Sequence, residues 1–471
     1  MLFNSIEFLL FFPIVCLLYF LLPHRFRYLL LLAAGYVFYA NAGVPALLFL
    51  LTTTIVTYIG GWLLYDGKKA GFAALVLSLG ILAWCKYVPY VCSLFGHGEV
   101  PVILPLGLSF YTFQSITYLM DCHRKECVPQ KNFLKVALFV SFFPTILSGP
   151  IARAKQLLPQ FEEEHSFDPI RAKEGLTYML WGYFLKMVIV SRLTILTDYV
   201  FSDQAMKGLP VLLAVLAYSF QIYCDFAGYS FIAIGCAKIL GFTLPANFRQ
   251  PYLSAGVADF WRRWHISLSS WFRDYLYIPL GGNRKGTVRK YVNVMIVFLL
   301  SGIWHGANVT FLFWGFLNGI YQVIEGTLFP SRRKGGAGEA DHPEKSSAFG
   351  SKLRIALTFL LMSFTWIFFR AQDLSEAFSV IGRIFSGSYL GALLDGTVFT
   401  LGLGVYNLLF VLAALALLIA ADLLCEKKGC DISGLLAHVR LPVRWLLYYC
   451  VVTMILFSCN LSTTEFLYTK F

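Results

Sequence analysis

The chain has 471 residues, of which 58% are hydrophobic and only 14% are charged. Soluble proteins carry about 25% charged residues, and the mean hydropathy of this chain is +0.68. A soluble domain of this size cannot bury so much apolar surface, so a water-soluble enzyme, a disordered protein and a coiled coil are excluded. The net charge is +12. In a membrane protein, an excess of basic residues is expected in the cytoplasmic loops, which face anionic lipid. Nucleic-acid binding is not indicated, because no segment offers the solvated basic face that it needs.

Apolar runs throughout the chain predict an all-α, polytopic membrane protein of about 10–13 transmembrane or re-entrant helices, because roughly 20 apolar residues cross a bilayer. The first run lacks a basic stretch before it and a small-residue cleavage pattern after it, so we interpret it as a span rather than a signal peptide. The predicted spans are 6–22, 28–39, 46–65, 72–95, 102–120, 175–199, 209–240, 353–369, 403–424 and 445–459.

Two further apolar regions begin and end beside basic residues, so each is expected to enter the membrane and return to the same side. Region 133–150 contains Pro144, Gly149 and Pro150, which break a straight helix. Region 291–329 is too long for one span and fits two half-helices that meet within the membrane at 302–308.

The alternation of basic loops predicts the orientation of the chain through the positive-inside rule. Both termini and the stretch 371–400 are expected outside, and the Gly-rich residues 331–351 form a mobile cytosolic loop. No soluble domain interrupts the sequence, so residues 1–471 are expected to form one integral-membrane domain.

His305 is the strongest candidate for a chemical role. An ionisable residue inside a membrane is costly, so it marks a functional hypothesis. Gly302 and Gly306 flank it and allow close approach of a ligand or backbone, while Trp304 and Trp314 can wall a pocket. A lone histidine that hydrogen-bonds a neighbouring helix is the alternative, but the forced chain reversal favours function.

Residues 259–282 are predicted to form an amphipathic helix at the cytoplasmic interface. Helical spacing places three tryptophans and a leucine on one stripe, mixed with three arginines and close to His265. This segment either anchors the protein at the interface or meets an anionic donor with His265 pointing inward, and the spacing alone does not separate the two. The stripe and the arginines are Trp261, Trp264, Leu268, Trp271, Arg262, Arg263 and Arg273.

Asp225 lies inside the apolar run 209–240. A buried carboxylate must be paired, and a histidine or arginine is the expected partner. A structural link between helices and a direct chemical role both fit.

Other chemistries have little support in the sequence. The cysteines show no metal-ligand or secreted-disulfide spacing and are expected to be buried apolar thiols. Cys224 and Ser301 are the nearest nucleophiles, but neither has an adjacent activating base.

The two histidine motifs together carry a family resemblance. The chain reads Trp-Arg-Arg-Trp-His at 261–265 and Ser-Gly-Ile-Trp-His-Gly-Ala at 301–307. It resembles the membrane-bound O-acyltransferase family, in particular the bacterial branch of alginate O-acetylation and teichoic-acid D-alanyl transfer proteins. The resemblance extends over nearly the whole chain and includes 104–114, 147–151, 221–235, 247–252 and 466–471.

The resemblance implies that His305 is the catalytic histidine, that His265 is the second motif histidine, and that a central tunnel joins a cytosolic acyl donor to an extracytoplasmic acceptor. The donor would be a thioester of coenzyme A or of an acyl-carrier protein, and no bound cofactor or metal is expected. A hydroxyl needs a base when it attacks a thioester, which a neutral imidazole supplies. Asn308 or Asp225 could mediate the role of His265, and Arg262, Arg263 and Arg273 could attract the donor.

The expected partners are membrane lipid, an exported polysaccharide acceptor and a separate extracytoplasmic transferase. D-alanyl transfer to teichoic acid is the alternative within the family. A transporter or flippase that uses His305 and Asp225 as a relay is the alternative outside it, although the sequence shows no inverted repeat.

Overall fold

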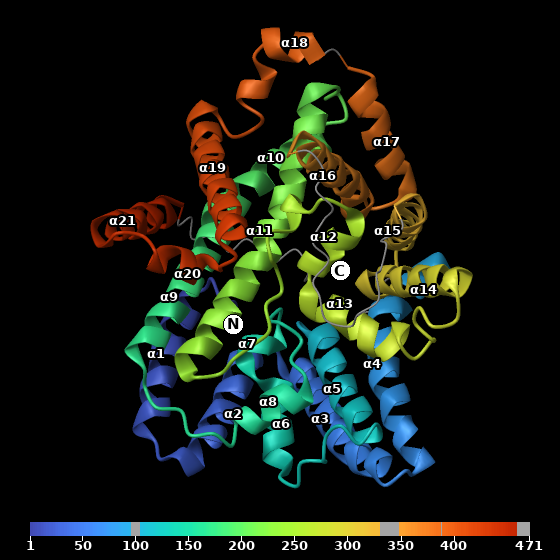
Figure 1. Ribbon diagram of the computed structural model, residues 1–471, viewed down its shortest axis with the longest axis vertical. Coiled ribbons are helices and arrows are strands. Elements are labelled where there is room, and N and C mark those ends of the chain that lie inside the picture. Colours follow the sequence, from blue (N-terminus) through green and yellow to red (C-terminus); the bar gives the residue numbers. More distant parts are fainter. Residues whose placement is uncertain (96–103, 330–347, 388, 459–471) are drawn as a thin grey trace. The chain divides into compact units, whose positions relative to one another are not determined.

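The computed structural model describes residues 1–95, 104–329, 348–387 and 389–458, and this part of the chain contains helices and no β-strand (Figure 1). Eight of the described helical segments are long and apolar enough to cross a membrane. They are Val44–Tyr65, Lys69–Cys92, Pro169–Ser202, Leu209–Leu240, Thr287–His305, Gly350–Arg370, Val405–Lys428 and Leu441–Ser458. The prediction of an all-α, polytopic membrane protein is therefore confirmed.

The chain divides into two compact units, the first of which comprises Met1–Val188, Cys224–Ala246 and Cys430–Phe471. Its described helices, apart from its share of α11, are α1 (Ile6–Leu21), α2 (His24–Ala40), α3 (Val44–Tyr65), the 3-10 turn η1 (Lys69–Gly71), α4 (Phe72–Leu94), α5 (Leu108–His123), α6 (Phe133–Ser141), α7 (Phe143–Ile146), α8 (Ala154–Gln160), α9 (Pro169–Tyr183), α20 (Ile432–Ala437) and α21 (Leu441–Ser458). A π-helical segment, η2 (Phe184–Val190), continues α9 and crosses the unit boundary.

The second unit comprises Ile189–Tyr223 and Asn247–Gly429. Its described elements are α10 (Ser191–Ser202), the first part of α11 (Leu209–Leu240), η3 (Pro251–Leu253), α12 (Val257–Arg263), α13 (Ile266–Phe272), the π-helical η4 (Arg273–Tyr277), α14 (Thr287–His305), α15 (Val309–Leu328), α16 (Ala348–Arg370), α17 (Leu374–Phe385), α18 (Tyr389–Leu394), η5 (Thr397–Phe399) and α19 (Val405–Lys428).

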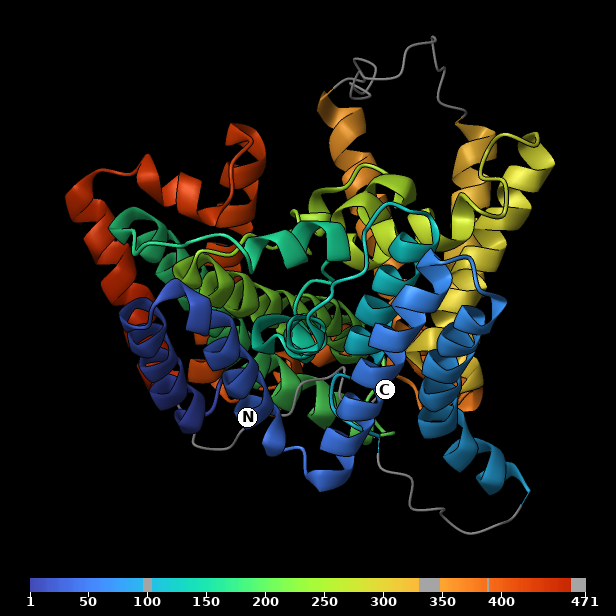
Figure 2. The same cartoon turned by 90° about the horizontal axis from the view of Figure 1, so that it is seen from below.

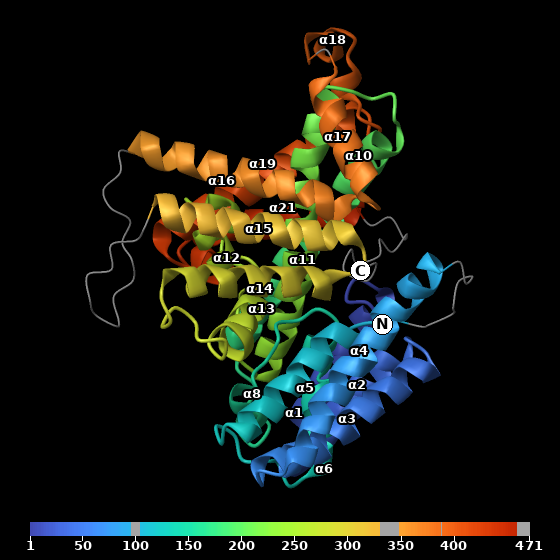
Figure 3. The same cartoon turned by 90° about the vertical axis from the view of Figure 1, so that its right-hand side faces the viewer.

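In the first unit, α3, α4 and α5 pack side by side (Figures 2 and 3). Gly60 and Gly61 of α3 make this approach possible, because a Cβ on Gly60 would overlap Leu119 and one on Gly61 would overlap the Tyr118 ring. Small residues at such contacts are the usual means by which membrane helices pack closely.

Two pairs of glycines bring α9 against the second part of α11. Gly175 faces Gly235, and Gly182 faces Gly228, so that a Cβ on any of the four would overlap the opposite backbone. This backbone contact places the start of η2 beside the middle of α11 within the first unit.

The interrupted region 133–150 is helical only in short pieces, as predicted. α6 ends at Ser141, Phe142 adopts a non-helical conformation, and Pro144 lies in the first turn of α7. Residues 136–150 are buried, which is where interrupted backbone is tolerated at membrane depth.

Region 291–329 forms an antiparallel hairpin of α14 and α15, and residues 306–308 form the turn, so the predicted break is confirmed (Figure 3). α14 has 19 residues and α15 has 20, and α14 is long and apolar enough to cross a membrane. α14 begins at Thr287, four residues before the predicted region, and includes the basic residues Arg289 and Lys290 in its first turn.

Two segments between the predicted spans are partly helical. Most of the proposed mobile loop 331–351 lies outside the described residues, and its last residues, 348–351, open α16. The stretch 371–400 contains α17 and α18.

Candidate functional site

His305 is the last residue of α14, and its side chain lies in a cluster of aromatic rings within the second unit. The residue is 4% exposed. Its imidazole centroid lies 4.6 Å from that of Trp304, 5.1 Å from those of Trp314 and Phe369, and 6.5 Å from that of Phe311. The walls contributed by Trp304 and Trp314 were expected from the sequence, whereas Phe369 comes from the distant helix α16.

The turn after His305 is closed by contacts between α14 and α15. A Cβ on Gly302 would overlap the Phe311 carbonyl, and one on Gly306 would overlap the Phe311 ring. Asn308 caps α15, because its side-chain oxygen accepts a hydrogen bond from the Thr310 N–H at 3.1 Å. These contacts fix the backbone on both sides of the imidazole.

The Asn308 amide also donates to the Gln372 carbonyl, in the segment that follows α16. Asn308 therefore holds the hairpin turn to its neighbour, which is a structural role distinct from the mediating role that the sequence suggested for it.

The expectation of one amphipathic helix over 259–282 is wrong, because the chain breaks at His265. α12 ends at Arg263 and α13 begins at Ile266, and His265 between them is left-handed, with φ 43° and ψ 54°. A non-glycine residue in this region is uncommon and persists where the surroundings hold it. His265 is also 1% exposed, so the imidazole at this break between the helices is buried in the protein.

A short extended segment holds the break at His265 through hydrogen bonds on either side. The Arg249 N–H donates to the Arg263 carbonyl at 3.0 Å, and the Ile266 N–H donates to the Asn247 carbonyl at 2.9 Å. The Ser267 hydroxyl donates to the Asn247 side-chain oxygen at 2.6 Å. Asn247 is thus part of the support of His265.

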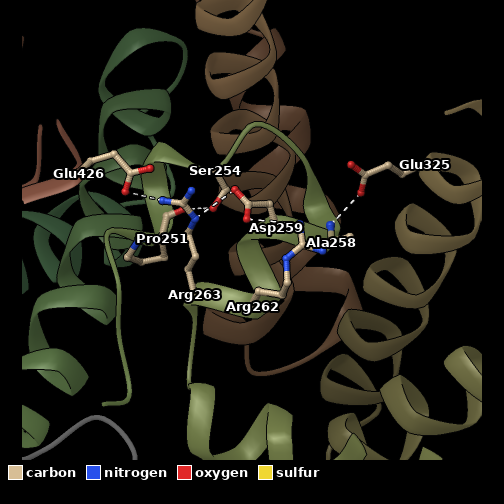
Figure 4. A network of polar contacts seen from close by, with 8 residues as sticks. All are labelled: Pro251, Ser254, Ala258, Asp259, Arg262, Arg263, Glu325 and Glu426. Atoms are coloured by element: carbon tan, nitrogen blue, oxygen red, sulfur yellow. Dashed lines mark hydrogen bonds and ion pairs between the residues drawn. The ribbon is translucent and has the colours of Figure 1, made fainter. Parts of the chain in front are cut away.

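Two carboxylates from other helices hold α12, and a third lies on α12 itself (Figure 4). Glu325 of α15 accepts from the Ala258 N–H at 2.8 Å and so caps α12. Arg263 binds Asp259 at 3.0 Å and Glu426, in the last turn of α19, at 2.7 Å. The Arg263 guanidinium is therefore engaged by two carboxylates of the protein itself.

The other two arginines are more open. Arg262 has a side chain 67% exposed and lies 3.4 Å from Asp259. Arg273 has a side chain 64% exposed and lies 2.9 Å from Asp274. Exposed pairs of this kind are weak, so both guanidinium groups remain accessible to an anionic ligand.

The tryptophan stripe packs within the second unit. Trp264 is 1% exposed and lies 5.4 Å from Phe260 and 5.0 Å from Trp366 between ring centroids. Trp261 lies 5.6 Å from Trp314. Trp264 and Trp271 are both buried, so these two indoles pack against other side chains of the protein.

Trp304 brings the two motif histidines into one cluster. Its indole lies 4.6 Å from His305 and 6.4 Å from His265 between ring centroids. Burial lowers the pKa of His265 from 6.5 to about 3, so this imidazole is neutral at physiological pH. A neutral imidazole can accept or donate one hydrogen bond without carrying charge.

Asp225 lies in the first unit and forms a buried ion pair with Lys186. The predicted histidine or arginine partner is wrong, because the π-helical turn η2 presents a lysine to the carboxylate. The side chains are 0% and 1% exposed for Lys186 and Asp225, and the Lys186 ammonium also lies 5.2 Å from the Tyr229 ring centroid.

Sequence reasoning missed several residues that support these groups: Lys186, Asn247, Glu325, Phe369 and Glu426. Lys186 carried a readable signal, since it is a charged residue inside the apolar run 175–199. The other four contact residues that are distant in the sequence, and the residues next to them in the chain form no pattern that predicts these contacts.

Comparison with known proteins gives a consistent answer. Residues 129–367 match the profile of MBOAT, the membrane-bound O-acyltransferase family. The "Probable alginate O-acetylase AlgI" of Pseudomonas putida is 39% identical over 411 residues, covering 82% of this chain and 80% of that protein. The peptidoglycan O-acetyltransferase of Helicobacter pylori is 33% identical over 426 residues, covering 81% and 79%. The teichoic acid D-alanyltransferase of Bacillus subtilis is 29% identical over 302 residues, covering 60% and 75%.

Proposed function

Because this chain belongs to the membrane-bound O-acyltransferase family, we propose that it moves an acetyl group from a cytosolic thioester to a hydroxyl of an extracytoplasmic polysaccharide. His305 acts as the general base. The observation that carries this assignment is the His305–Trp304–His265 cluster, which lies where the two motifs of the resemblance meet. The acceptor is the polysaccharide itself or a partner transferase that completes the transfer.

In the proposed reaction, His305 accepts a proton from the acceptor hydroxyl and later returns one to the thiolate leaving group. His305 takes the hydroxyl proton as the hydroxyl oxygen attacks the thioester carbonyl carbon. The carbon–sulfur bond then breaks, and the thiolate leaving group receives the proton from the imidazolium. An imidazole suits this task because its unperturbed pKa lies near neutral pH, so that it can both accept and return a proton.

His265 orients the donor or the acceptor beside Trp304. Its neutral state and its burial support a positioning role, since a side chain that is 1% exposed is held by the residues packed around it.

The donor is a thioester of coenzyme A or of an acyl-carrier protein. Arg262 and Arg273, whose side chains are largely exposed, attract the phosphate groups that both donors carry. Arg263, which is already engaged by Asp259 and Glu426, supports the site instead. Asp225 has the Lys186 ammonium as its partner, which favours the structural alternative for this residue.

The protein resides in the bacterial cytoplasmic membrane with both termini on the extracytoplasmic side. The alternation of basic loops supports this orientation. The acetyl group is favoured over D-alanyl because the alginate and peptidoglycan O-acetyltransferases are more similar to this chain than the teichoic acid enzymes are.

The experiment is a transfer assay in proteoliposomes that contain the full chain. Acetyl-labelled coenzyme A or acetyl carrier protein is supplied on one side, and alginate or peptidoglycan fragments with the co-expressed partner are supplied on the other. Label that becomes base-labile ester on the polysaccharide supports the proposal. Passage of intact solute across the membrane without ester formation would show a transporter, and transfer of D-alanine in place of acetate would show the other family activity.

A further inference from the structure

The turn that follows α5 folds back on the helix it ends. Lys125 is left-handed, with φ 61°, the Glu126 N–H donates to the Asp121 carbonyl at 2.9 Å, and the Lys125 N–H donates to the Cys122 carbonyl at 3.1 Å. These two bonds define a Schellman motif. The motif returns Cys127 to the last turn of α5, where Cys122 lies.

Neighbouring elements of the first unit hold this turn. The Lys125 ammonium lies 3.8 Å from the Tyr65 ring centroid, and Glu126 binds Lys155 at 2.8 Å. The position of Cys127 over the helix end is therefore fixed from several directions.

The two thiols interact directly. The Cys127 N–H donates to the Asp121 carbonyl at 3.2 Å, which sets Cys127 over the last turn of α5 where Cys122 lies, and the Cys122 side chain is the strongest influence on the Cys127 sulfur. The Cys127 thiol donates to the Val128 carbonyl at 3.5 Å. Neither cysteine is part of a disulfide. The spacing of the cysteines in the sequence does not predict this pair, because it depends on the left-handed Lys125 between them.

The two sulfurs differ in access and in acidity. Cys122 is fully buried, whereas Cys127 is partly exposed. The hydrogen bond from Cys122 lowers the pKa of the Cys127 thiol, against the opposing effects of burial and of the Asp121 carboxylate. An accessible, more acidic thiol beside a buried second thiol is the arrangement of a peroxide-sensitive pair.

We propose that Cys122 and Cys127 form a reversible thiol–disulfide pair that peroxides oxidise, with Cys127 as the reactive thiol and Cys122 as the resolving thiol. The Cys127 thiolate attacks a peroxide oxygen, the oxygen–oxygen bond breaks, and Cys127 becomes a sulfenic acid. The Cys122 sulfur then attacks the Cys127 sulfur, so that the sulfur–sulfur bond forms as the sulfur–oxygen bond breaks. Two thiols are oxidised, and hydrogen peroxide is reduced to two waters.

The predicted orientation puts this turn in the cytoplasm. Disulfides there are transient because glutathione and thioredoxin keep thiols reduced. A pair that forms only during peroxide stress fits that compartment, and the inference does not depend on the proposed acyl transfer.

The experiment titrates the purified full-length protein in detergent with hydrogen peroxide, alkylates the remaining thiols after denaturation, and maps them by peptide mass spectrometry. Cys122 and Cys127 are expected to lose alkylation together, to appear as one cross-linked peptide, and to recover with dithiothreitol. Cys430, which is also partly exposed, is the internal reference and should remain alkylated over the same peroxide range.

Two variants separate the roles. Cys122→Ser should trap a sulfenic acid at Cys127 that reacts with dimedone, and Cys127→Ser should leave Cys122 alkylated. The wild-type protein alone can overturn the proposal. Oxidation of Cys127 no faster than that of Cys430, sulfenic acid at Cys127 without the cross-link, or a cross-link that dithiothreitol does not reverse would each contradict it.

Discussion

The Trp304 indole and the His265 imidazole lie 6.4 Å apart between ring centroids, with their planes inclined by 56°. The same indole lies 4.6 Å from the imidazole of its own neighbour in the chain, His305. One side chain therefore lies against two histidines that are distant in sequence.

Replacement of Trp304 should test this link. Trp304→Ala removes a buried aromatic side chain and should destabilise the protein by about 3–5 kcal/mol, with loss of acyl transfer. Trp304→Phe keeps an aromatic surface and should retain most of the stability and a measurable part of the activity. Thermal unfolding in detergent and the transfer assay check both. Equal activity in the Ala variant and in wild type would show that the indole has no part in the site.

His265 should make the protein less stable in acid. Its pKa is about 3 in the folded chain and 6.5 when unperturbed, so between these values the unfolded state binds a proton that the folded state does not. The contribution of His265 to stability is therefore complete above about pH 6.5 and falls as the pH decreases toward 3.

The measurement is the melting temperature at pH 7 and at pH 5 for wild type and for His265→Asn. Asparagine tolerates the left-handed conformation well, so the variant keeps the turn and removes the titration. The decrease on acidification should be smaller in the variant. An equal decrease in both proteins would mean that His265 protonates without cost in the fold.

The Lys186–Asp225 pair predicts a strong non-additivity. Lys186→Met leaves a buried carboxylate without its ion-pair partner and should cost about 3–5 kcal/mol. The double variant Lys186→Met/Asp225→Leu removes both charges and should recover most of that loss. Urea or thermal unfolding of the two single variants and the double variant gives the coupling directly, and additive effects would argue against a mutually dependent pair.

The three arginines Arg262, Arg263 and Arg273 should divide into two groups by the effect of their replacement. Arg263→Gln breaks contacts to Asp259 and Glu426 and should lower both stability and the rate of transfer. Arg262→Gln and Arg273→Gln remove exposed guanidinium groups and should raise the KM for the thioester donor with little change in stability. Thermal unfolding and donor-dependent kinetics distinguish the groups. A KM effect confined to Arg263→Gln would reverse our assignment of the donor contacts.

Much of the fold is readable from the sequence because lipid imposes a simple rule on helix length and composition. The hairpin break at 302–308 and the interruption near Pro144 follow from glycine and proline at membrane depth. The break at His265 does not follow, because its residues have the spacing of a single helix. It is imposed by the Arg249 N–H, which donates to the Arg263 carbonyl, and by Asn247, which accepts from the Ile266 N–H and the Ser267 hydroxyl.

The residues of the candidate site likewise fall into those that the sequence predicts and those that it does not. Ionisable residues in apolar surroundings identified His305 and Asp225, and the same reasoning applied to residues 175–199 would have found Lys186. The arginines look alike in sequence, and only the carboxylates of distant helices separate Arg263 from Arg262. Partners that lie far along the chain leave no local pattern, which is why the supporting residues emerge only from the structure.

The central claim is that His305 is the base that activates the acceptor hydroxyl. The most direct measurement is the rate of labelled acetyl transfer in proteoliposomes for wild type, His305→Ala and His305→Gln at equal membrane abundance. The exposed His438 provides the matched control His438→Ala. We predict that both His305 variants lose about 10²–10⁴-fold in rate while the control keeps the wild-type rate, and transfer by His305→Ala at the wild-type rate would contradict the account.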